Sequence, residues 1–314
     1  MNVKRFLAIL FTVIVAAVWT LWLPVSVSGT NTPGVSGDPG WKEQILKERA
    51  EKDHEFKTSR TSPMAGADRL TIKAGQGQVF ITENDNHIVV TSQDSPGVLF
   101  GLKEQNGQWY RIKRAEGISW VSGEKPVSLE EALPAQVQMD AGRYFFNLYI
   151  SKTDATLIVF DSKRPQLLEF AHLLYYEPNP EFVVKATFTR SKTIETTKIT
   201  TSRKLEKQFF RYGTVEFELK GKKCKLTALK LDTGTGSEGG ELFIPFTDST
   251  TGSETYDIGR FLDVPEPKDS VLIIDFNRCY NPLCNYSPAY NCPIPPLENF
   301  LDIAVHAGEK TYPH

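Results

Sequence analysis

The residues best suited to chemistry gather in the last quarter of the sequence, around apolar runs that we expect to form strands. Acidic, amide, hydroxyl and aromatic side chains follow the ends of these runs. Side chains that leave separate strand ends can converge at one rim, where a guanidinium anchors an anion and carboxylates orient a polar ligand. The candidate ligand-binding residues are Asp248, Thr250, Tyr256, Arg260, Asp275, Asn277, Tyr280 and Asn281.

Two kinds of function fit this set of residues. The first is binding of a small polar or anionic ligand, or of a partner, with Arg260 as the anion anchor. The second is hydrolysis, in which Asp248 or Asp275 activates water and Arg260 stabilises the developing negative charge. A structural role is open beside both, because Asp, Asn, Thr and Tyr also satisfy backbone groups in long irregular loops. The sequence assigns no catalytic residue and no cofactor.

Three of the four cysteines, Cys279, Cys284 and Cys292, lie close together near the C-terminus. Outside the cytoplasm, pairing is the default, and a disulfide from Cys284 to Cys292 would close a short loop. A thiolate metal site and a reactive thiol are alternatives, although the spacing matches no standard zinc or iron–sulfur motif. Cys224 alternates with Leu226 and is typical of an ordinary strand residue.

Other signals exclude several classes of protein. The sequence contains no dinucleotide-binding glycine motif, P-loop, nucleophile elbow or HExxH motif, and its histidines lack metal-ligand spacing, so no metal site is predicted. The glycine-rich stretch 234–240 is typical of a flexible turn. Asp53 beside His54 fits a solvated helix face better than a site. The net charge of −2 offers no broad cationic surface, so nucleic acid is not an expected partner.

The candidate residues must be positioned by the secondary structure around them. That structure is indicated by short β-branched and aromatic runs separated by turn residues, a pattern typical of antiparallel sheets. Asn106-Gly107 is a tight-turn signal between two of them. No long helical period separates the runs, which disfavours parallel α/β folds. The expected strands cover residues 78–82, 88–92, 98–102, 109–113, 118–122, 143–150 and 156–161, and then 173–176, 182–189, 194–200, 213–220, 224–231, 242–246 and 271–276.

Two helices are expected before the strands. Lys4 and Arg5 precede an apolar run from Phe6 to Val25, which is long enough to span a bilayer at about 1.5 Å per residue. We expect a signal anchor, with a cleaved signal peptide as the alternative, and a location in the cell membrane with the globular part outside, or else secreted or periplasmic. Residues 41–57 form an amphipathic pattern with Trp41, Ile45, Leu46, Ala50 and Phe56 on one face.

The predicted fold is mainly β: a membrane helix and an amphipathic helix followed by two antiparallel β domains, each a sandwich or barrel. The predicted divisions are a signal segment (1–25), a flexible linker (26–40), a helix with a loop (41–66), an N-terminal β-sandwich (67–163) and a C-terminal β domain (164–314). The expected partners are a membrane, through residues 6–25, and a small polar ligand.

The C-terminal string from Asp275 to Tyr312, DFNRCYNPLCNYSPAYNCPIPPLENFLDIAVHAGEKTY, resembles the bacterial family labelled domain of unknown function 1684, as does the preceding LFIPFTDSTTGSETYDIGRFLD. The resemblance extends over residues 41–312 and implies no known activity. Family members without an export segment keep the cysteine pair, which favours a metal or thiol role over a purely oxidative one. The family signature falls on Asp248, Thr250, Gly252, Thr255, Tyr256, Gly259, Arg260, Asp263, Asp275, Asn277, Tyr280, Asn281, Pro282, Cys284, Tyr286, Cys292, Pro293, Pro296, Asn299, Gly308 and Glu309.

Overall fold

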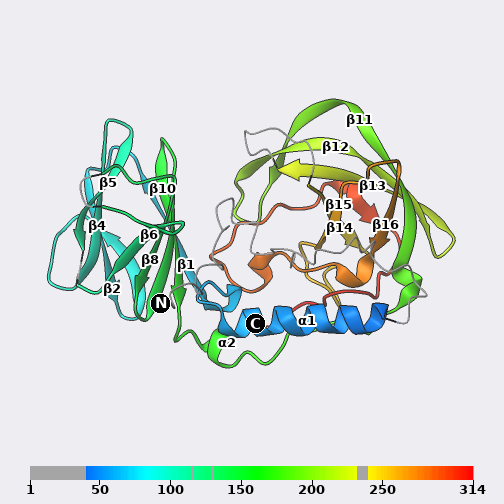
Figure 1. Ribbon diagram of the computed structural model, residues 1–314, viewed down its shortest axis with the longest axis horizontal. Coiled ribbons are helices and arrows are strands. Elements are labelled where there is room, and N and C mark those ends of the chain that lie inside the picture. The colour runs from blue at the N-terminus through cyan, green and yellow to red at the C-terminus, as the bar shows by residue number, and fades with distance from the viewer. Residues whose placement is uncertain (1–39, 115, 129–130, 232–239, 314) are drawn as a thin grey trace, which may run out of the picture. The chain divides into compact units, whose positions relative to one another are not determined.

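The computed structural model describes residues 40–313, apart from residues 115, 129–130 and 232–239. The described chain divides into two compact units (Figure 1): unit 1 comprises residues 67–163, and unit 2 comprises residues 40–66 and 164–313. Both units are built mainly from antiparallel sheets, which confirms the mainly β class. The linker at 26–39 and the glycine-rich stretch at 234–239 lie outside the described residues.

Unit 1 contains a six-stranded sheet in the order β1-β10-β9-β8-β6-β7 and a four-stranded sheet in the order β3-β2-β4-β5. Its strands are β1 (Gly66–Lys73), β2 (Gln78–Asn84), β3 (His87–Thr91), β4 (Val98–Gln105), β5 (Gln108–Arg114), β6 (Ser119–Ser122), β7 (Lys125–Pro126), β8 (Gln136–Ala141), β9 (Tyr144–Ile150) and β10 (Asp154–Asp161). The sequence did not indicate β1, β7 or β8.

The core of unit 1 lies between its two sheets. Phe100 of β4 packs edge-on against Trp120 of β6 at 5.2 Å and against Phe146 of β9 at 5.3 Å between ring centroids. These contacts join the four-stranded sheet to the six-stranded sheet, so unit 1 is a sandwich. Asn106 and Gly107 both have positive φ, 54° and 75°, between β4 and β5. This is the turn that the sequence predicts.

Unit 2 contains a seven-stranded sheet in the order β15-β14-β13-β12-β11-β16, with the short β17 paired to β14. Its two edge strands nearly meet, because Tyr280, which follows β16, exchanges backbone hydrogen bonds with Phe261 of β15 at 2.8 and 3.0 Å. The sheet is therefore a nearly closed barrel. The strands are β11 (Val183–Thr200), β12 (Glu206–Leu219), β13 (Lys222–Leu231), β14 (Glu241–Asp248), β15 (Arg260–Pro265), β16 (Val271–Asp275) and β17 (Phe300–Leu301).

Apolar side chains fill the barrel through a simple alternation. Along β12, Val215, Phe217 and Leu219 are buried while Glu216 and Glu218 are exposed, as a strand with one solvated face requires. The two strands expected at 182–189 and 194–200 are a single strand, β11, whose register with β12 shifts between residues 190 and 195. A bulge of this kind bends a strand without ending it, and so the sequence pattern looked like two strands.

The helices are short except for α1, which runs beside the C-terminal tail of unit 2 (Figure 1). We define the tail as residues 276–313. The helices are α1 (Trp41–Thr58) and α2 (Pro165–Leu168), with 3-10 turns η1 (Pro63–Ala65), η2 (Pro180–Phe182), η3 (Phe276–Arg278), η4 (Leu283–Asn285) and η5 (Leu297–Asn299).

The face that α1 buries differs from the predicted one. Trp41, Ile45 and Phe56 are buried as expected, but Leu46 is 47% exposed. Lys52, which was not expected on the buried face, is only 6% exposed. Lys52 is buried because it pairs with a carboxylate of the tail, as described below. A charged residue thus belongs to the packed face of this helix.

The predicted single-pass membrane location is wrong, because none of the described helices is long and apolar enough to cross a bilayer. The one long helix, α1, carries charges of both signs along its length. The run from Phe6 to Val25, on which the prediction was based, lies outside the described residues.

The strand expected at residues 173–176 is also wrong. Only Tyr175 makes an isolated bridge, to Glu309. The apolar side chains of this stretch have another role, because Leu173 joins a small cluster with Phe56 of α1 and Phe170. Burial against a helix explains why the apolar run does not extend into a strand.

Candidate functional site

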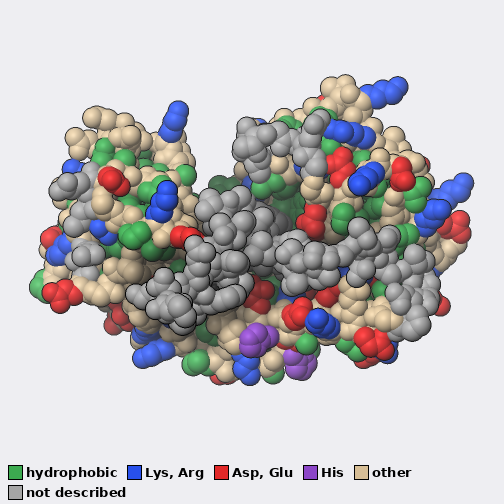
Figure 2. Space-filling model, in the orientation of Figure 1, with side chains coloured by type: hydrophobic (Ala, Val, Ile, Leu, Met, Phe, Trp, Pro, Cys, Tyr) green, Lys and Arg blue, Asp and Glu red, His purple; other side chains and the backbone are tan. Residues whose placement is uncertain are grey.

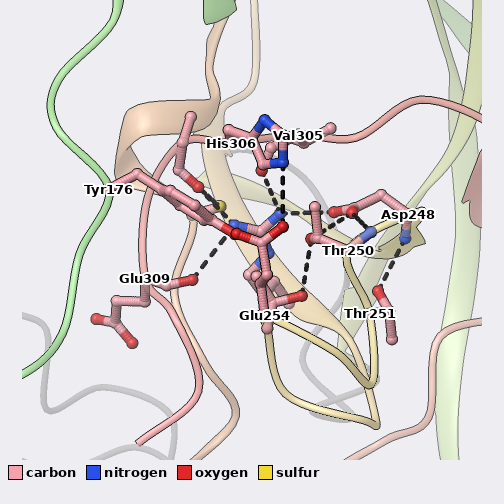
Figure 3. Close-up of polar contacts among 12 residues, drawn as sticks. Tyr176, Asp248, Thr250, Thr251, Glu254, Val305, His306 and Glu309 are labelled. Carbon is pink, nitrogen blue, oxygen red and sulfur yellow. Dashed lines mark hydrogen bonds and ion pairs between the residues drawn. The ribbon is translucent and has the colours of Figure 1, made fainter.

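Arg260 and Asp248 form an ion pair in the interior of unit 2, and neither side chain has any exposed surface. Arg260 Nη2 donates to Asp248 Oδ2 at 2.5 Å and to the carbonyl of Val305 at 2.8 Å (Figure 3). Its Nη1 donates to the carbonyls of Ala307 and, at 3.3 Å, Glu309. The guanidinium therefore fixes the tail to β14 and β15, and it has no surface from which to anchor an outside anion.

The other oxygen of Asp248 organises the loop between β14 and β15. Asp248 Oδ1 accepts from the backbone N–H of Thr250 at 2.6 Å and from its hydroxyl at 2.5 Å. The Thr250 hydroxyl also lies 3.0 Å from that of Thr255. Carboxylates that accept from nearby backbone N–H groups are typical of turns, so Asp248 and Thr250 act here as a loop-forming pair.

Asp275 and Asn277 form a second cluster, separate from the first. Asp275 Oδ2 accepts from the indole of Trp41 at 2.8 Å and from Arg278, while Oδ1 accepts from the backbone and side chain of Asn277, both at 2.9 Å. Asn277 in turn bonds both backbone groups of Asn179, at 2.8 and 2.9 Å. Both Asp275 oxygens are thus engaged in joining α1 and residue 179 to the end of β16.

A third cluster surrounds Glu309, which is 2% exposed. Its carboxylate pairs with Lys52 of α1 and accepts from the hydroxyl of Tyr286 at 2.6 Å and the backbone N–H of Asn281 at 2.8 Å. Burial and the charge of Glu309 hold the pKa of Tyr286 well above its usual range, so this phenol remains a donor. Tyr280 lies beside the cluster, with its hydroxyl on Asp263 and its ring 5.3 Å from the Lys52 ammonium.

The remaining predicted residues lie around the cysteines. The Tyr256 hydroxyl donates to the carbonyl of Cys284 at 3.2 Å. Cys284 and Cys292 are neighbours, since the backbone N–H of Cys284 donates to Cys292 Sγ at 3.3 Å, and both are thiols rather than a disulfide. Among the described residues, no group of three or more Cys, His, Asp or Glu side chains could hold a metal ion.

By their hydrogen bonds, the predicted residues divide into four clusters. Asp248, Thr250 and Arg260 lie together, but neither Asp248 nor Arg260 shares a hydrogen bond with Asp275 in the described part of the chain. Asp53, for which the sequence favoured a solvated helix face, is half-buried and accepts from the backbone N–H of Leu173 at 2.9 Å. In each cluster the polar groups bind other parts of unit 2, which corresponds to the structural role that the sequence left open.

Three side chains with exposed surface, Tyr176, Glu254 and His306, contact one another in the region drawn in Figure 3, and the sequence analysis did not single them out. The carboxylate of Glu254 accepts from the hydroxyl of Tyr176 at 3.1 Å, and its other oxygen lies 3.3 Å from His306 Nε2. The rings of Tyr176 and His306 are 5.4 Å apart, and the Lys310 ammonium lies 4.7 Å from the Tyr176 ring centroid. We call Tyr176, Glu254 and His306 the surface cluster.

Burial and the hydrogen bond to Glu254 raise the pKa of Tyr176 to about 12, so at neutral pH its hydroxyl is a proton donor. Glu254 and His306 side chains keep 50% and 47% of their surface exposed. The surface cluster therefore offers a carboxylate acceptor, a phenol and an imidazole to solvent, in contrast with the fully enclosed Arg260–Asp248 ion pair.

Comparison with known proteins places this arrangement in a family. The family model described as "Protein of unknown function (DUF1684)" matches residues 168–310. An uncharacterized protein of Haloarcula marismortui, known from a solution NMR structure, is 35% identical, with 46% of this chain and 80% of that chain covered and a TM-score of 0.40. Residues 168–310 of the chain belong to the DUF1684 family. No curated protein matches it.

The DUF1684 match includes all four buried clusters apart from the α1 side chains, and it includes the surface cluster. Glu309 and Tyr286 belong to the signature recognised in the sequence, but Lys52, which pairs with Glu309, lies on α1, outside the matched range. The sequence held a signal for Glu254 and His306 only in that both lie in the signature strings. Tyr176 was predicted only as the last residue of the strand expected at 173–176 and gave no signal of a site.

Proposed function

We propose that this DUF1684 protein binds a small polar ligand at the exposed side of the signature loops, with the surface cluster as its binding site. The observation that carries the proposal is that three side chains from separate segments, Tyr176, Glu254 and His306, are already in contact at the surface. Groups that are positioned before binding lose less conformational freedom when a ligand arrives.

Hydrogen bonds to the backbone hold the segments that carry Glu254 and His306. Thr250 accepts from the backbone N–H of Glu254 at 3.0 Å through its carbonyl, and Glu254 accepts from the backbone N–H of Thr311 at 3.1 Å. The Arg260 bonds to the carbonyls of Val305 and Ala307 hold the backbone on both sides of His306. The buried pair thus serves the proposed site by positioning residues, whereas the anion-anchoring role expected for Arg260 has no exposed atom to perform it.

The chemistry of the surface cluster indicates the class of ligand. Glu254 is a carboxylate that can accept from ligand hydroxyls, while His306 and the adjacent Lys310 can donate to anionic oxygens. Lys310 and Glu254 carry opposite charges, and on the face drawn in Figure 2 basic and acidic side chains of the described residues are interspersed. We therefore propose a polyhydroxylated ligand that carries an anionic group.

Hydrolysis by Asp248 or Asp275 receives no support from the geometry. Both oxygens of each carboxylate accept hydrogen bonds from side chains or backbone of unit 2. A general base needs a free acceptor within reach of its water. Binding is accordingly the function that we favour.

The test is an NMR titration of the full chain with glucose, gluconate and glucose 6-phosphate, followed through the histidine ring signals. We expect a saturable shift of His306 that is strongest with an anionic sugar, while His54, His87 and His172 do not move. Substitution E254Q should weaken binding about tenfold or more, because hydrogen bonds to a charged group contribute roughly 1.5–3 kcal/mol.

The matched control is E216Q, which removes an exposed carboxylate that pairs with Lys225 at 2.9 Å elsewhere in unit 2. This variant should bind as the wild type does. Absence of a saturable His306 shift with all three probes, or equal weakening by E254Q and E216Q, would contradict the proposal.

A further inference from the structure

Cys284 and Cys292 are held side by side by the backbone around them. Cys284 lies in η4, and its N–H donates to Cys292 Sγ at 3.3 Å. Cys292 is clamped to the turn after β11, because its N–H donates to Ser202 Oγ at 3.1 Å and its carbonyl accepts from the N–H of Ser202 at 2.8 Å. The two cysteines are therefore held as neighbours, and their side chains share a hydrogen bond.

The two thiols of this pair differ in their access to solvent. Cys284 is only partly buried, whereas Cys292 is 4% exposed. A partly exposed thiol next to a buried one is the arrangement in which the first meets an oxidant and the second attacks the oxidised sulfur.

The other two cysteines lack this arrangement. Cys279 is 1% exposed and donates to the carbonyl of Ala307 at 3.4 Å, in the packed interior of the tail. Cys224 is partly buried on β13, where its thiol donates to the carbonyl of Lys222 at 3.6 Å. Cys224 is partly buried, as Cys284 is, but within the described part of the chain its thiol bonds to a backbone carbonyl and not to another cysteine. It therefore provides an internal reference for reactivity.

We propose that Cys284 and Cys292 form a redox-active dithiol in which a hydroperoxide oxidises Cys284 and Cys292 then closes an intramolecular disulfide. This activity is separate from ligand binding at the surface cluster and does not depend on it.

The direction of the pKa shifts agrees with these roles. A hydrogen bond from the Cys292 thiol lowers the pKa of Cys284 and outweighs the opposing effect of burial. Burial, together with that same hydrogen bond, holds the pKa of Cys292 well above its usual range. Cys284 is thus the thiol that ionises first, and Cys292 keeps the proton that it donates.

The proposed reaction proceeds in two balanced steps. The Cys284 thiolate attacks one oxygen of hydrogen peroxide, the O–O bond breaks, and the departing hydroxide takes a proton to become water, which leaves a sulfenic acid on Cys284. The Cys292 sulfur then attacks the Cys284 sulfur, the S–O bond breaks, and hydroxide leaves with the Cys292 proton as a second water. The dithiol loses two electrons and the peroxide gains them.

The first measurement uses the reduced wild-type chain and requires no variant. Its cysteines are alkylated with iodoacetamide at a series of pH values, and the rate at each site is read by peptide mass spectrometry. We expect the Cys284 rate to rise at lower pH than that of Cys224, whose pKa burial raises. At pH 7 Cys284 should react about tenfold faster or more, since one pKa unit changes the thiolate fraction about tenfold.

The second measurement adds hydrogen peroxide and maps the products under non-reducing conditions. We expect a Cys284–Cys292 disulfide in the wild type and in C224S, and a sulfenic acid on Cys284, trapped by dimedone, in C292S. Matching pH profiles for Cys284 and Cys224, a persistent sulfenic acid in the wild type, or a bound metal that protects both thiols would each overturn the proposal.

Discussion

The two units of this protein bury polar side chains to very different extents. In unit 1 the buried polar residues are Arg111, Asn147, Thr156 and Asp161, whereas all the others among the described residues lie in unit 2. Most of those fall between Asp248 and Glu309. Unit 1 is a sandwich whose core is filled by alternating apolar side chains, while unit 2 adds to its barrel a tail with little regular structure.

The difference shows that a tail without regular secondary structure needs side-chain partners for its buried backbone groups. Strands satisfy their backbone groups through a ladder, but a buried segment without a ladder must find side-chain partners. Arg260 supplies donors to three tail carbonyls, and Glu309 accepts from the N–H of Asn281. In this protein, Arg260 and Glu309 of the signature recognised in the sequence are therefore side chains that hold the tail in place.

The largest expected effect comes from R260M, which removes one partner of a fully buried ion pair and leaves Asp248 uncompensated. We expect a loss of about 3–5 kcal/mol in the free energy of unfolding of unit 2. Urea unfolding followed by the indole N–H signals separates the units, because Trp41 reports unit 2, and Trp109 and Trp120 report unit 1. The unit 1 signals should keep their midpoint.

The matched control for R260M is R143M in unit 1. Arg143 donates to Asp161 at 2.9 and 2.8 Å, but its side chain is 24% exposed. Partly exposed pairs contribute far less than buried ones, so this variant should shift the unit 1 midpoint only slightly. If R260M and R143M lowered the urea midpoints of their own units equally, the proposed difference between the buried and the partly exposed ion pair would be wrong.

A second pair of variants compares two glycines with nearly identical backbone conformations. Gly308 has φ of 73°, and an added Cβ would lie 2.4 Å from Cys279 Sγ and 2.5 Å from its carbonyl oxygen. Gly142 has φ of 72° with nothing within 4 Å. G142A should cost unit 1 about 1–2 kcal/mol, the usual strain of the left-handed conformation.

Substitution G308A should cost unit 2 clearly more than G142A costs unit 1, because the backbone strain is joined by contact with the tail's own backbone. Urea midpoints from the same indole signals measure both. Similar losses would mean that the tail can move away from the new methyl group, and hence that it is less tightly held than we infer.

The smallest expected effect concerns pH. Burial acts to raise the pKa of Asp161, but hydrogen bonds from Arg143 and from the backbone of Lys163 outweigh it, and the net pKa is lowered. Ionised Asp161 therefore stabilises folded unit 1 above the usual aspartate range near about pH 4, and this contribution is lost as the pH falls through the lowered value.

An NMR titration of the Asp161 carboxyl carbon checks this directly. Its midpoint should lie below the usual aspartate value in the wild type and move upward in R143M. A midpoint that is the same in both proteins would show that the ion pair does not set the pKa of this carboxylate.

The sequence predicted the parts of the fold that depend on local patterns. Alternation along residues 215–219 and the turn at Asn106-Gly107 need only neighbouring residues, and both were predicted. The role of the polar residues was harder to predict. Asp248 and Arg260 need hydrogen-bond or charge partners when they are buried, but the sequence does not show which residues those partners are. Lys52 and Glu309 are 257 positions apart, and no spacing rule connects them.

The central claim is that the exposed surface cluster binds the ligand while the buried pair only positions it. The most direct test titrates D248N and E254Q with glucose 6-phosphate under conditions where the Trp41 indole signal confirms that unit 2 is folded. We predict that D248N binds within about twofold of the wild type, while E254Q binds about tenfold more weakly or worse. The opposite result, with binding lost in folded D248N and kept in E254Q, would contradict the account.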